Sequence, residues 1–85
     1  MAKKKIIPER KSELIANKKL QIKLGKRIKE IREKRGMSQT ELAIMMNNRD
    51  RQVVQRLEKG GTNCSLNLLR LVATALDVEI SDLFK

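Results

Sequence analysis

The segment 36–42 (GMSQTEL) constrains the fold more than any other part of this chain. Glycine supplies the left-handed residue that ends a helix, and Ser-x-x-Glu is the capping box that begins one. Met37 and Leu42 take the two positions of a hydrophobic staple across the turn. The segment therefore predicts that one helix ends at about Arg35, that a second begins at Ser38, and that a tight turn joins them.

Apolar residues recur at helical spacing on both sides of this turn, and short breaker motifs separate the runs. Asn47-Asn48 is the first interruption, and Gly60-Gly61 is the second. Asp50 is placed to cap a third helix over residues 51–59, Ser65 is placed to cap a fourth, and a final short helix follows. Five short helices, with no pair of strands, predict an all-α fold. The apolar positions expected to build the core are Leu24, Ile28, Ile31, Leu42, Ala43, Met45, Met46, Val54, Leu57, Leu66, Leu69, Val72, Ala73, Leu76, Ile80, Leu83 and Phe84.

The residue types that are missing exclude several classes of function. The chain has no histidine, one cysteine (Cys64) and one aromatic residue (Phe84). A zinc site, a Cys–His or Ser–His dyad and an internal disulfide therefore cannot be assembled, and stacking of single-stranded nucleic acid on aromatic rings is disfavoured. No apolar run reaches membrane-spanning length, and the basic start lacks the apolar stretch of a signal peptide. We expect a cytoplasmic protein that is not an enzyme and holds no metal or cofactor.

Positive charge is concentrated at the amino-terminal end of the chain. The net charge is +10, and residues 1–35 account for all of it, with fourteen basic and four acidic side chains. Residues 36–85 are neutral overall. Because counterion release favours a basic surface on a phosphate backbone, the expected partner is a nucleic acid.

Residues 1–22 are interpreted as a basic extension and residues 23–85 as the domain proper. Pro8 suits the first turn of a helix that starts at about Glu9 and is expected to run through Leu14, Ile15 and Leu20 toward the domain. The first seven residues are expected to be disordered in isolation. Three roles for the extension remain open. The three are an arm that contacts the minor groove or phosphates of DNA, a dimerisation element, and a disordered tail.

The predicted third helix is apolar on one side and rich in arginine and glutamine on the other. Val54 and Leu57 share the apolar side. The opposite side holds Arg51, Gln52, Gln55, Arg56 and Lys59. Arginine pairs bidentately with guanine O6 and N7, and glutamine with adenine N6 and N7, so the helix carries the side chains of a major-groove reader. An ordinary solvated face has the same composition, and the residues alone leave both interpretations open.

From Leu24 to Phe84 the chain resembles the Xre-like regulators, the Cro and lambda-repressor type of helix-turn-helix protein. Two motifs that are specific in combination carry the resemblance, SQTELA at residues 38–43 and RLEKG at residues 56–60. Further matches lie at residues 24–28, 31–32, 36–37, 63, 65–66, 75–78 and 82–84. The resemblance implies a five-helix lambda-repressor-like domain that binds double-stranded DNA sequence-specifically. It also implies a transcriptional regulator, a repressor or autoregulator, that acts as a homodimer.

The resemblance implies roles for single residues as well. The side chains implied to contact base edges are Arg51, Gln52, Gln55 and Arg56. Those implied to contact backbone phosphates, which set register but carry no sequence information, are Gln39, Lys59 and Thr62. Arg32 and Glu58 match an ion pair that links the first helix to the end of the recognition helix. The turn 47–50 is one residue longer than the usual family pattern, so the recognition helix is expected at a slightly altered angle.

Homodimerisation is also expected from geometry, because one recognition helix reads only about four or five base pairs and two half-sites are needed for specificity. Two other interpretations compete with operator binding. An antitoxin-like or bridging adaptor of the same fold would bind another protein first, and the arginines and glutamines of residues 51–59 favour DNA over this role. A binder of membrane surfaces or RNA would use residues 1–35, where basic side chains interrupt the apolar positions and tryptophan is absent.

Overall fold

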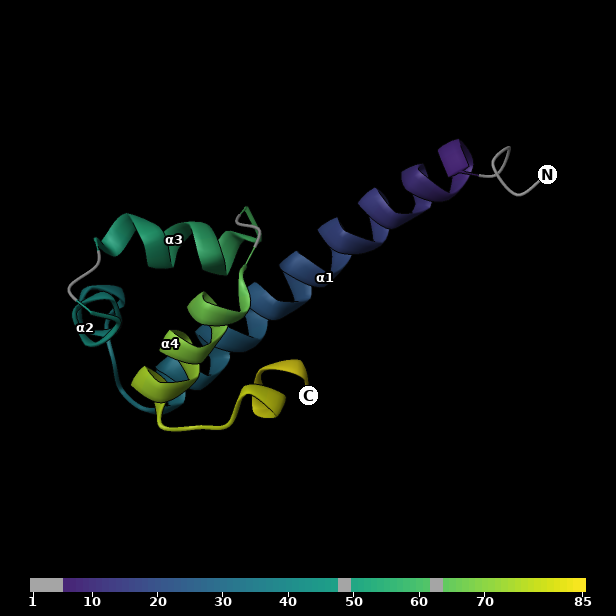
Figure 1. Cartoon of the computed structure of the whole chain (residues 1–85). Coiled ribbons are helices and arrows are strands. Elements are labelled where there is room, and N and C mark those ends of the chain that lie inside the picture. The colour runs from purple at the N-terminus through teal and green to yellow at the C-terminus, as the bar shows by residue number, and fades with distance from the viewer. Residues whose placement is uncertain (1–5, 48–49, 62–63) are drawn as a thin grey trace.

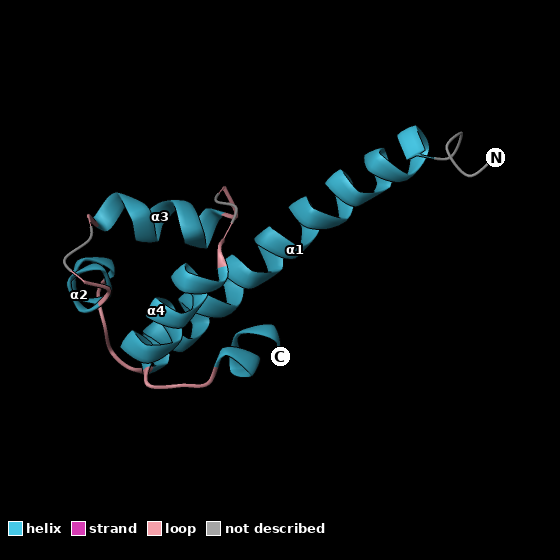
Figure 2. Cartoon of the chain, in the orientation of Figure 1, coloured by secondary structure: helices cyan, strands magenta, loops and turns pink. Residues whose placement is uncertain are grey.

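The computed structural model describes the backbone of residues 6–47, 50–61 and 64–85, and the side chains of these ranges from residue 17 onward. The described residues form four α-helices and one 3₁₀-helix (Figure 1), which are α1 (Ile6–Lys34), α2 (Gln39–Met45), α3 (Arg51–Lys59), α4 (Leu66–Leu76) and η2 (Ile80–Phe84). Loops and turns connect them, and no strand occurs in these ranges (Figure 2). The predicted all-α fold is confirmed.

Helix α1 joins the helix predicted in the extension and the first predicted helix of the domain into one. It runs for 29 residues and passes through the expected boundary between residues 22 and 23. Its amino-terminal part projects from the body that the other helices form (Figure 1). Its interior is rich in lysine, glutamate and leucine, which are strong helix formers, and neither glycine nor proline stands between Glu9 and Leu24. Nothing in that interval therefore stops the helix.

The start of α1 bears on two further expectations. The helix begins at Ile6 rather than at about Glu9, and Pro8 lies in its first turn, as predicted. Residues 1–5 belong to the segment expected to be disordered, and they lie outside the described residues. None of the helices in the described ranges combines the length and the apolar composition that a membrane crossing needs.

The turn between α1 and α2 contains the predicted capping box. The backbone N–H of Glu41 donates to Ser38 Oγ (3.0 Å), and the backbone N–H of Ser38 donates to Glu41 Oε1 (2.7 Å). Gly36, just after α1, has a left-handed φ of +68°, and Asn47, just after α2, has a φ of +75°. The start and the end of α2 are therefore fixed by interactions between residues that are close in sequence.

The next two helices also begin and end where the sequence predicts. Asp50 immediately precedes α3, and Gly60 ends it with a φ of +76°. Ser65 Oγ accepts the backbone N–H of Leu68 (3.1 Å) at the start of α4. The carboxylate of Asp50, by contrast, makes no capping hydrogen bond, so its predicted role as a side-chain cap is wrong.

The core lies between α1, α4 and the α2–α3 pair, and η2 closes it near the C-terminus. Most apolar positions expected to build the core are buried, but Met45, Leu66 and Phe84 are 59%, 74% and 45% exposed. On α2 the buried residues are Leu42 and Ala43, with Met46 directly after the helix, and Met45 lies off the face that they share. Leu66 is the first residue of α4 and Phe84 the last of η2, so each stands at the edge of its helix.

Helices α1 and α3 approach so closely that only glycine fits at two positions. A Cβ atom at Gly25 would lie 2.3 Å from the carbonyl oxygen of Leu57 and 2.7 Å from that of Glu58. A Cβ atom at Gly60 would lie 2.7 Å from the Cα atom of Ile22. These neighbours are backbone atoms, which cannot rotate away as the end of a side chain can. The two glycines therefore set the distance at which α3 packs on α1.

Replacing Gly25 with alanine should destabilise the fold. Alanine is the better helix former by about 1 kcal/mol, yet its methyl group would push the backbone of α3 away from α1. We expect a net loss of about 1–3 kcal/mol in the free energy of unfolding, measured by chemical denaturation. Gly61→Ala is the control, because its Cβ would lie 3.7 Å from the carbonyl oxygen of Arg56, an ordinary contact. Equal stability of G25A and the wild type would contradict the close approach.

Candidate nucleic-acid interface

Helix α3 presents two faces of opposite character, as its sequence register predicts. Val54 and Leu57 are buried in the core. The side chains on the other face are exposed, except for Gln55, which is half-buried, and they are Arg51, Gln52, Gln55, Arg56 and Lys59. Helix α3 lies along one edge of the body (Figure 1). The core therefore holds α3 by its apolar side and leaves the arginine and glutamine side open to a partner.

A shallow polar hollow of about 340 Å³ lies at the amino-terminal end of α3. It is lined by Asp50, Arg51, Gln52 and Gln55. Three of these four were predicted to contact base edges, and the structure brings them together on one surface. Asp50 was predicted only as a helix cap, so its place on this surface was missed. The absence of its capping hydrogen bond depends on the local backbone and side-chain geometry, for which the sequence carries no signal.

Below the carboxyl-terminal end of α3, Arg32 and Glu58 form a bidentate ion pair. Arg32 Nε donates to Glu58 Oε2 (2.6 Å), and Arg32 Nη2 donates to Glu58 Oε1 (3.2 Å). The side chains are only 10% and 4% exposed. The hydrogen bond to Glu58 raises the pKa of Arg32 above its ordinary value. Arg32 Nη1 also donates to the carbonyl oxygen of Met37 (2.7 Å), which ties the pair to the turn before α2.

Gln39 joins this ion pair. Its Nε2 atom donates to Glu58 Oε1 (3.0 Å), so the first residue of α2 is connected directly to α3. The half-buried amide retains a second N–H, and the backbone N–H groups of Gln39 and Thr40 in the first turn of α2 have no partner within the helix, whereas that of Glu41 donates to Ser38. These are donors of the kind that contact a phosphate, which is the role predicted for Gln39. That Glu58 is the residue through which Gln39 contacts α3 was not predicted.

The other two predicted phosphate contacts lie near the carboxyl-terminal end of α3. Lys59 is the last residue of the helix and is exposed. Thr62 lies outside the described residues. Lys18, which the sequence analysis did not single out, donates from Nζ to the carbonyl oxygen of Gly60 (3.0 Å). Part of the extension, residues 1–22, is thus attached to the end of the recognition helix.

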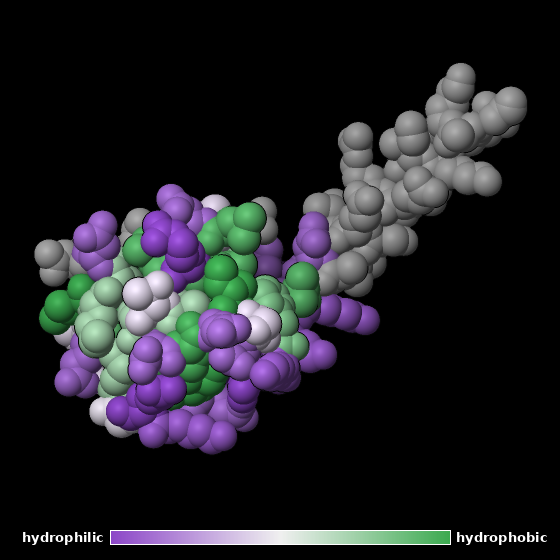
Figure 3. Space-filling view, turned by 60° about the horizontal axis from the view of Figure 1, so that its bottom comes forward, coloured by the Kyte–Doolittle hydropathy of each residue, from purple (hydrophilic) through white to green (hydrophobic). Residues whose placement is uncertain are grey.

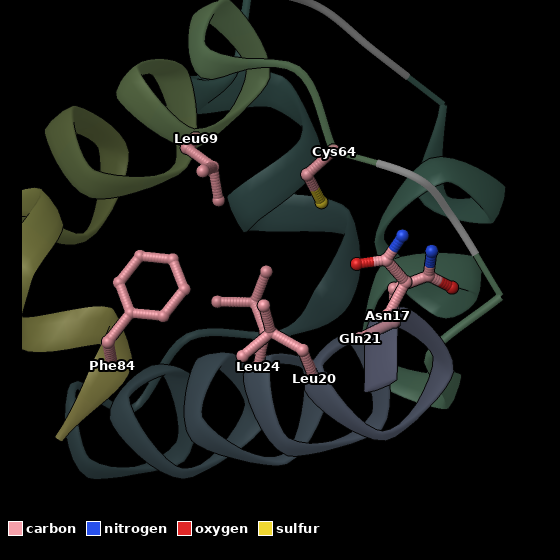
Figure 4. A pocket seen from close by; sticks show the side chains of 7 residues that line it. All are labelled: Asn17, Leu20, Gln21, Leu24, Cys64, Leu69 and Phe84. Carbon is pink, nitrogen blue, oxygen red and sulfur yellow. The ribbon is translucent and has the colours of Figure 1, made fainter. Parts of the chain in front are cut away.

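A second hollow, of about 100 Å³, opens on a different part of the domain (Figure 4). The residues that line it come from α1, the segment before α4, α4 and η2, and they are Asn17, Leu20, Gln21, Leu24, Cys64, Leu69 and Phe84. Its volume is well below the roughly 300–1,000 Å³ of typical small-molecule sites. Burial raises the pKa of the Cys64 thiol, which therefore stays protonated at neutral pH. Within the described residues, no group of acidic or cysteine side chains is arranged to hold a metal ion.

The helix-turn-helix family model matches residues 28–83, which is most of the chain and includes α2 and α3 entirely. The chain belongs to this family. The predicted resemblance to Xre and lambda-repressor-like proteins is confirmed, and the chain is a DNA-binding protein of the transcription-regulator class. A comparison with curated proteins found no significant match.

Solved structures of regulators share this fold. The restriction-modification controller protein C.AhdI from Aeromonas hydrophila is 41% identical, with 74% of this chain and 94% of that chain covered and a TM-score of 0.71. The clp gene regulator ClgR from C. glutamicum is 28% identical, with 76% and 83% covered and a TM-score of 0.72. A point mutant of the restriction-modification controller protein C.Esp1396I is 32% identical, with 76% and 83% covered and a TM-score of 0.69.

Removing the carboxylate of Glu58 should lower the stability of this helix-turn-helix protein. Glu58→Ala leaves the guanidinium of Arg32 buried without its counter-charge, which costs about 3–5 kcal/mol in the free energy of unfolding. Glu33→Ala, one residue from Arg32 but exposed, is the control and should change stability little. Thermal and chemical denaturation measure both. A Glu58→Ala protein that melts like the wild type but no longer binds DNA would instead show that Glu58 faces the DNA.

Proposed function

We propose that this protein binds a DNA operator sequence-specifically and represses transcription, including that of its own gene, as a homodimer. The observation that carries the proposal is the exposed face of α3, where two arginines and two glutamines lie opposite the buried Val54 and Leu57. Repression requires only occupancy, because a protein bound over a promoter excludes the polymerase. The solved regulators with the same fold support a role in gene control.

In the proposed complex, α3 lies in the major groove and α2 crosses the backbone. Arginine would donate two hydrogen bonds to guanine, and glutamine would exchange two with adenine, so these side chains carry the sequence readout. The residues that we propose for base contacts are Arg51, Gln52, Gln55 and Arg56. Those that we propose for phosphate contacts are Gln39, Lys59 and Thr62. Arg32 and Glu58 are assigned a structural role beneath them.

Homodimerisation is proposed because a single α3 spans too few base pairs for an operator to be unique in a genome. The domain has apolar surface away from α3 that suits a second copy. In Figure 3, turned to bring forward the side that is lowest in Figure 1, apolar residues (green) gather in the middle of the domain and hydrophilic ones (purple) surround them. Leu20 and Phe84, which border the hollow of Figure 4, are 50% and 45% exposed. Exposed apolar patches of this kind support association.

A second candidate function, an adaptor that binds another protein first, is favoured by one observation on α2. Ile44 and Met45 are 55% and 59% exposed, and with Met37 and Glu41 they line a shallow hollow. This apolar surface lies on the element next to the recognition helix. The two candidates differ in what the α3 side chains contribute, and the alanine variants described next distinguish them.

Alanine variants of the α3 face should lose specificity without losing stability. Arg51, Gln52, Gln55 and Arg56 lie outside the apolar face, so truncating each should leave the melting temperature nearly unchanged. Each lost bidentate contact should cost about 1–3 kcal/mol of discrimination at one base position in each half-site. We expect the ratio of operator affinity to random-duplex affinity to collapse for at least two of the four variants.

Lys59→Ala is the control for this panel, because a phosphate contact is the same in every duplex. It should weaken operator and random duplex alike and leave their ratio unchanged. The measurement is titration of each variant against both duplexes at one fixed salt concentration, since these affinities depend strongly on salt. If all four α3 variants keep the wild-type ratio, α3 does not read bases and the adaptor function takes precedence.

The bound sequence should be palindromic if the protein acts as a homodimer. Selection from a random duplex pool should return two inverted half-sites whose centres lie about 34–36 Å apart, one helical turn, or a multiple of it. Sedimentation of the complex should give two chains per duplex. A single, non-repeated consensus bound by one chain would contradict the dimer while leaving sequence-specific binding intact.

A further inference from the structure

We infer that Asp50 is a specificity-determining residue that accepts a hydrogen bond from the N4 amino group of a cytosine in each half-site. This inference rests on the proposed operator binding and adds to it an acidic side chain and the base that it selects. Asp50 was predicted from the sequence only as the cap of α3, and none of the roles assigned above includes it.

The position of Asp50 is that of a base-reading residue. It immediately precedes α3, at the end of a recognition helix that reaches furthest into the major groove. It is exposed, and it lines the polar hollow together with Arg51, Gln52 and Gln55, all proposed to contact bases. A base edge that meets those three side chains therefore lies within reach of the Asp50 carboxylate.

Within the described residues, the carboxylate of Asp50 makes no contact that holds the fold together. Aspartate before a helix usually accepts a backbone N–H of the first turn, but here that hydrogen bond is absent. None of the ion pairs found among the described residues includes it. Ser38 and Ser65 do cap α2 and α4 with their side chains, whereas the side chain in the same position before α3 does not. The oxygens of Asp50 thus remain available as acceptors on the surface proposed to meet DNA.

The chemistry of the groove selects the base that such an acceptor prefers. A carboxylate is repelled by phosphates, and it is repelled by the acceptor atoms O6 and N7 of guanine and O4 of thymine. Adenine offers an amino donor, but its acceptor N7 lies beside that donor. Cytosine presents the N4 amino group with no neighbouring acceptor of its own in the groove. An unpaired carboxylate at this position therefore favours cytosine over the other three bases.

The competing explanation is that Asp50 acts only through its charge near the positive end of the α3 dipole. Removing the charge would then lower the melting temperature but leave every base preference as it was. If Asp50 contacts cytosine, removing its carboxylate must instead change the base preference at one position of each half-site. The melting temperature therefore reports on the role in stability, and the base preference reports on the contact with cytosine.

The test uses the full-length protein, with Asp50→Ala and Asp50→Asn as variants and Asp77→Asn as the control. Asparagine is as good a helix cap as aspartate, so D50N keeps the start of α3 intact. Asp77 is exposed, and its φ of +60° is a conformation that asparagine tolerates, so D77N removes the same charge at a distant site. Each protein selects sequences from a pool of random duplexes, and single-base substitutions of the wild-type consensus are then compared by competition.

The expected result is a cytosine preference of the wild type at one position of each half-site. D50A should reduce that preference by about tenfold, as loss of a base contact implies. D50N should admit adenine there, because an amide supplies both the acceptor for N6 and the donor for N7. D77N should match the wild type at every position.

A D50A profile identical to that of the wild type at every position would overturn the inference, whether or not the variant melts at a lower temperature. That outcome would leave the proposed function standing, provided that wild-type selection still returns a consensus. A wild-type protein that selects no consensus from the pool would overturn the proposed function, and the role of Asp50 with it.

Discussion

The buried carboxylate of Glu58 is the point at which three helices of this domain are joined. It belongs to α3, it accepts two hydrogen bonds from Arg32 of α1, and it accepts a third from Gln39 of α2. A buried ion pair adds little net stability compared with apolar packing, because both charges give up their hydration. Removing one partner is nevertheless costly, since the other is left in the interior. The network therefore acts chiefly on geometry, as it fixes α3 relative to α2, the helix that we propose crosses the DNA backbone.

Close backbone approach complements this network at the same end of α3. Gly25 and Gly60 bring α1 within direct contact of the last turn of the recognition helix, and Lys18 donates to the carbonyl of Gly60. A lysine at the end of a helix also interacts favourably with the negative end of the dipole. Residues 18–25 of α1 thus hold the carboxyl-terminal end of α3, although that segment precedes the family match, which starts at residue 28.

The sequence predicted most of the helix boundaries because caps and stops act between neighbouring residues. Ser38, Gly60 and Ser65 needed only their local context to be recognised. The attachment of α1 to the rest of the fold was not predicted, because it involves residues far apart in sequence. Lys18 and Gly60 are separated by 42 positions, and no spacing rule connects them. The same holds for Gln39 and Glu58, which are 19 positions apart.

The register of a nine-residue helix was enough to predict which side chains of α3 face outward, but not what holds the helix in place. The structure shows that its two ends have different surroundings. The carboxyl-terminal end, from Leu57 to Gly60, is packed against α1 and bonded to α2. At the amino-terminal end, four polar side chains line an open hollow, and they are Asp50, Arg51, Gln52 and Gln55. This division suits the proposed entry of α3 into the major groove, because the polar side chains at its amino-terminal end stay open to a partner while the contacts at the other end hold its angle. Under the proposed function, substitutions at the open end would therefore change the sequence that is read without disturbing the contacts that orient the helix.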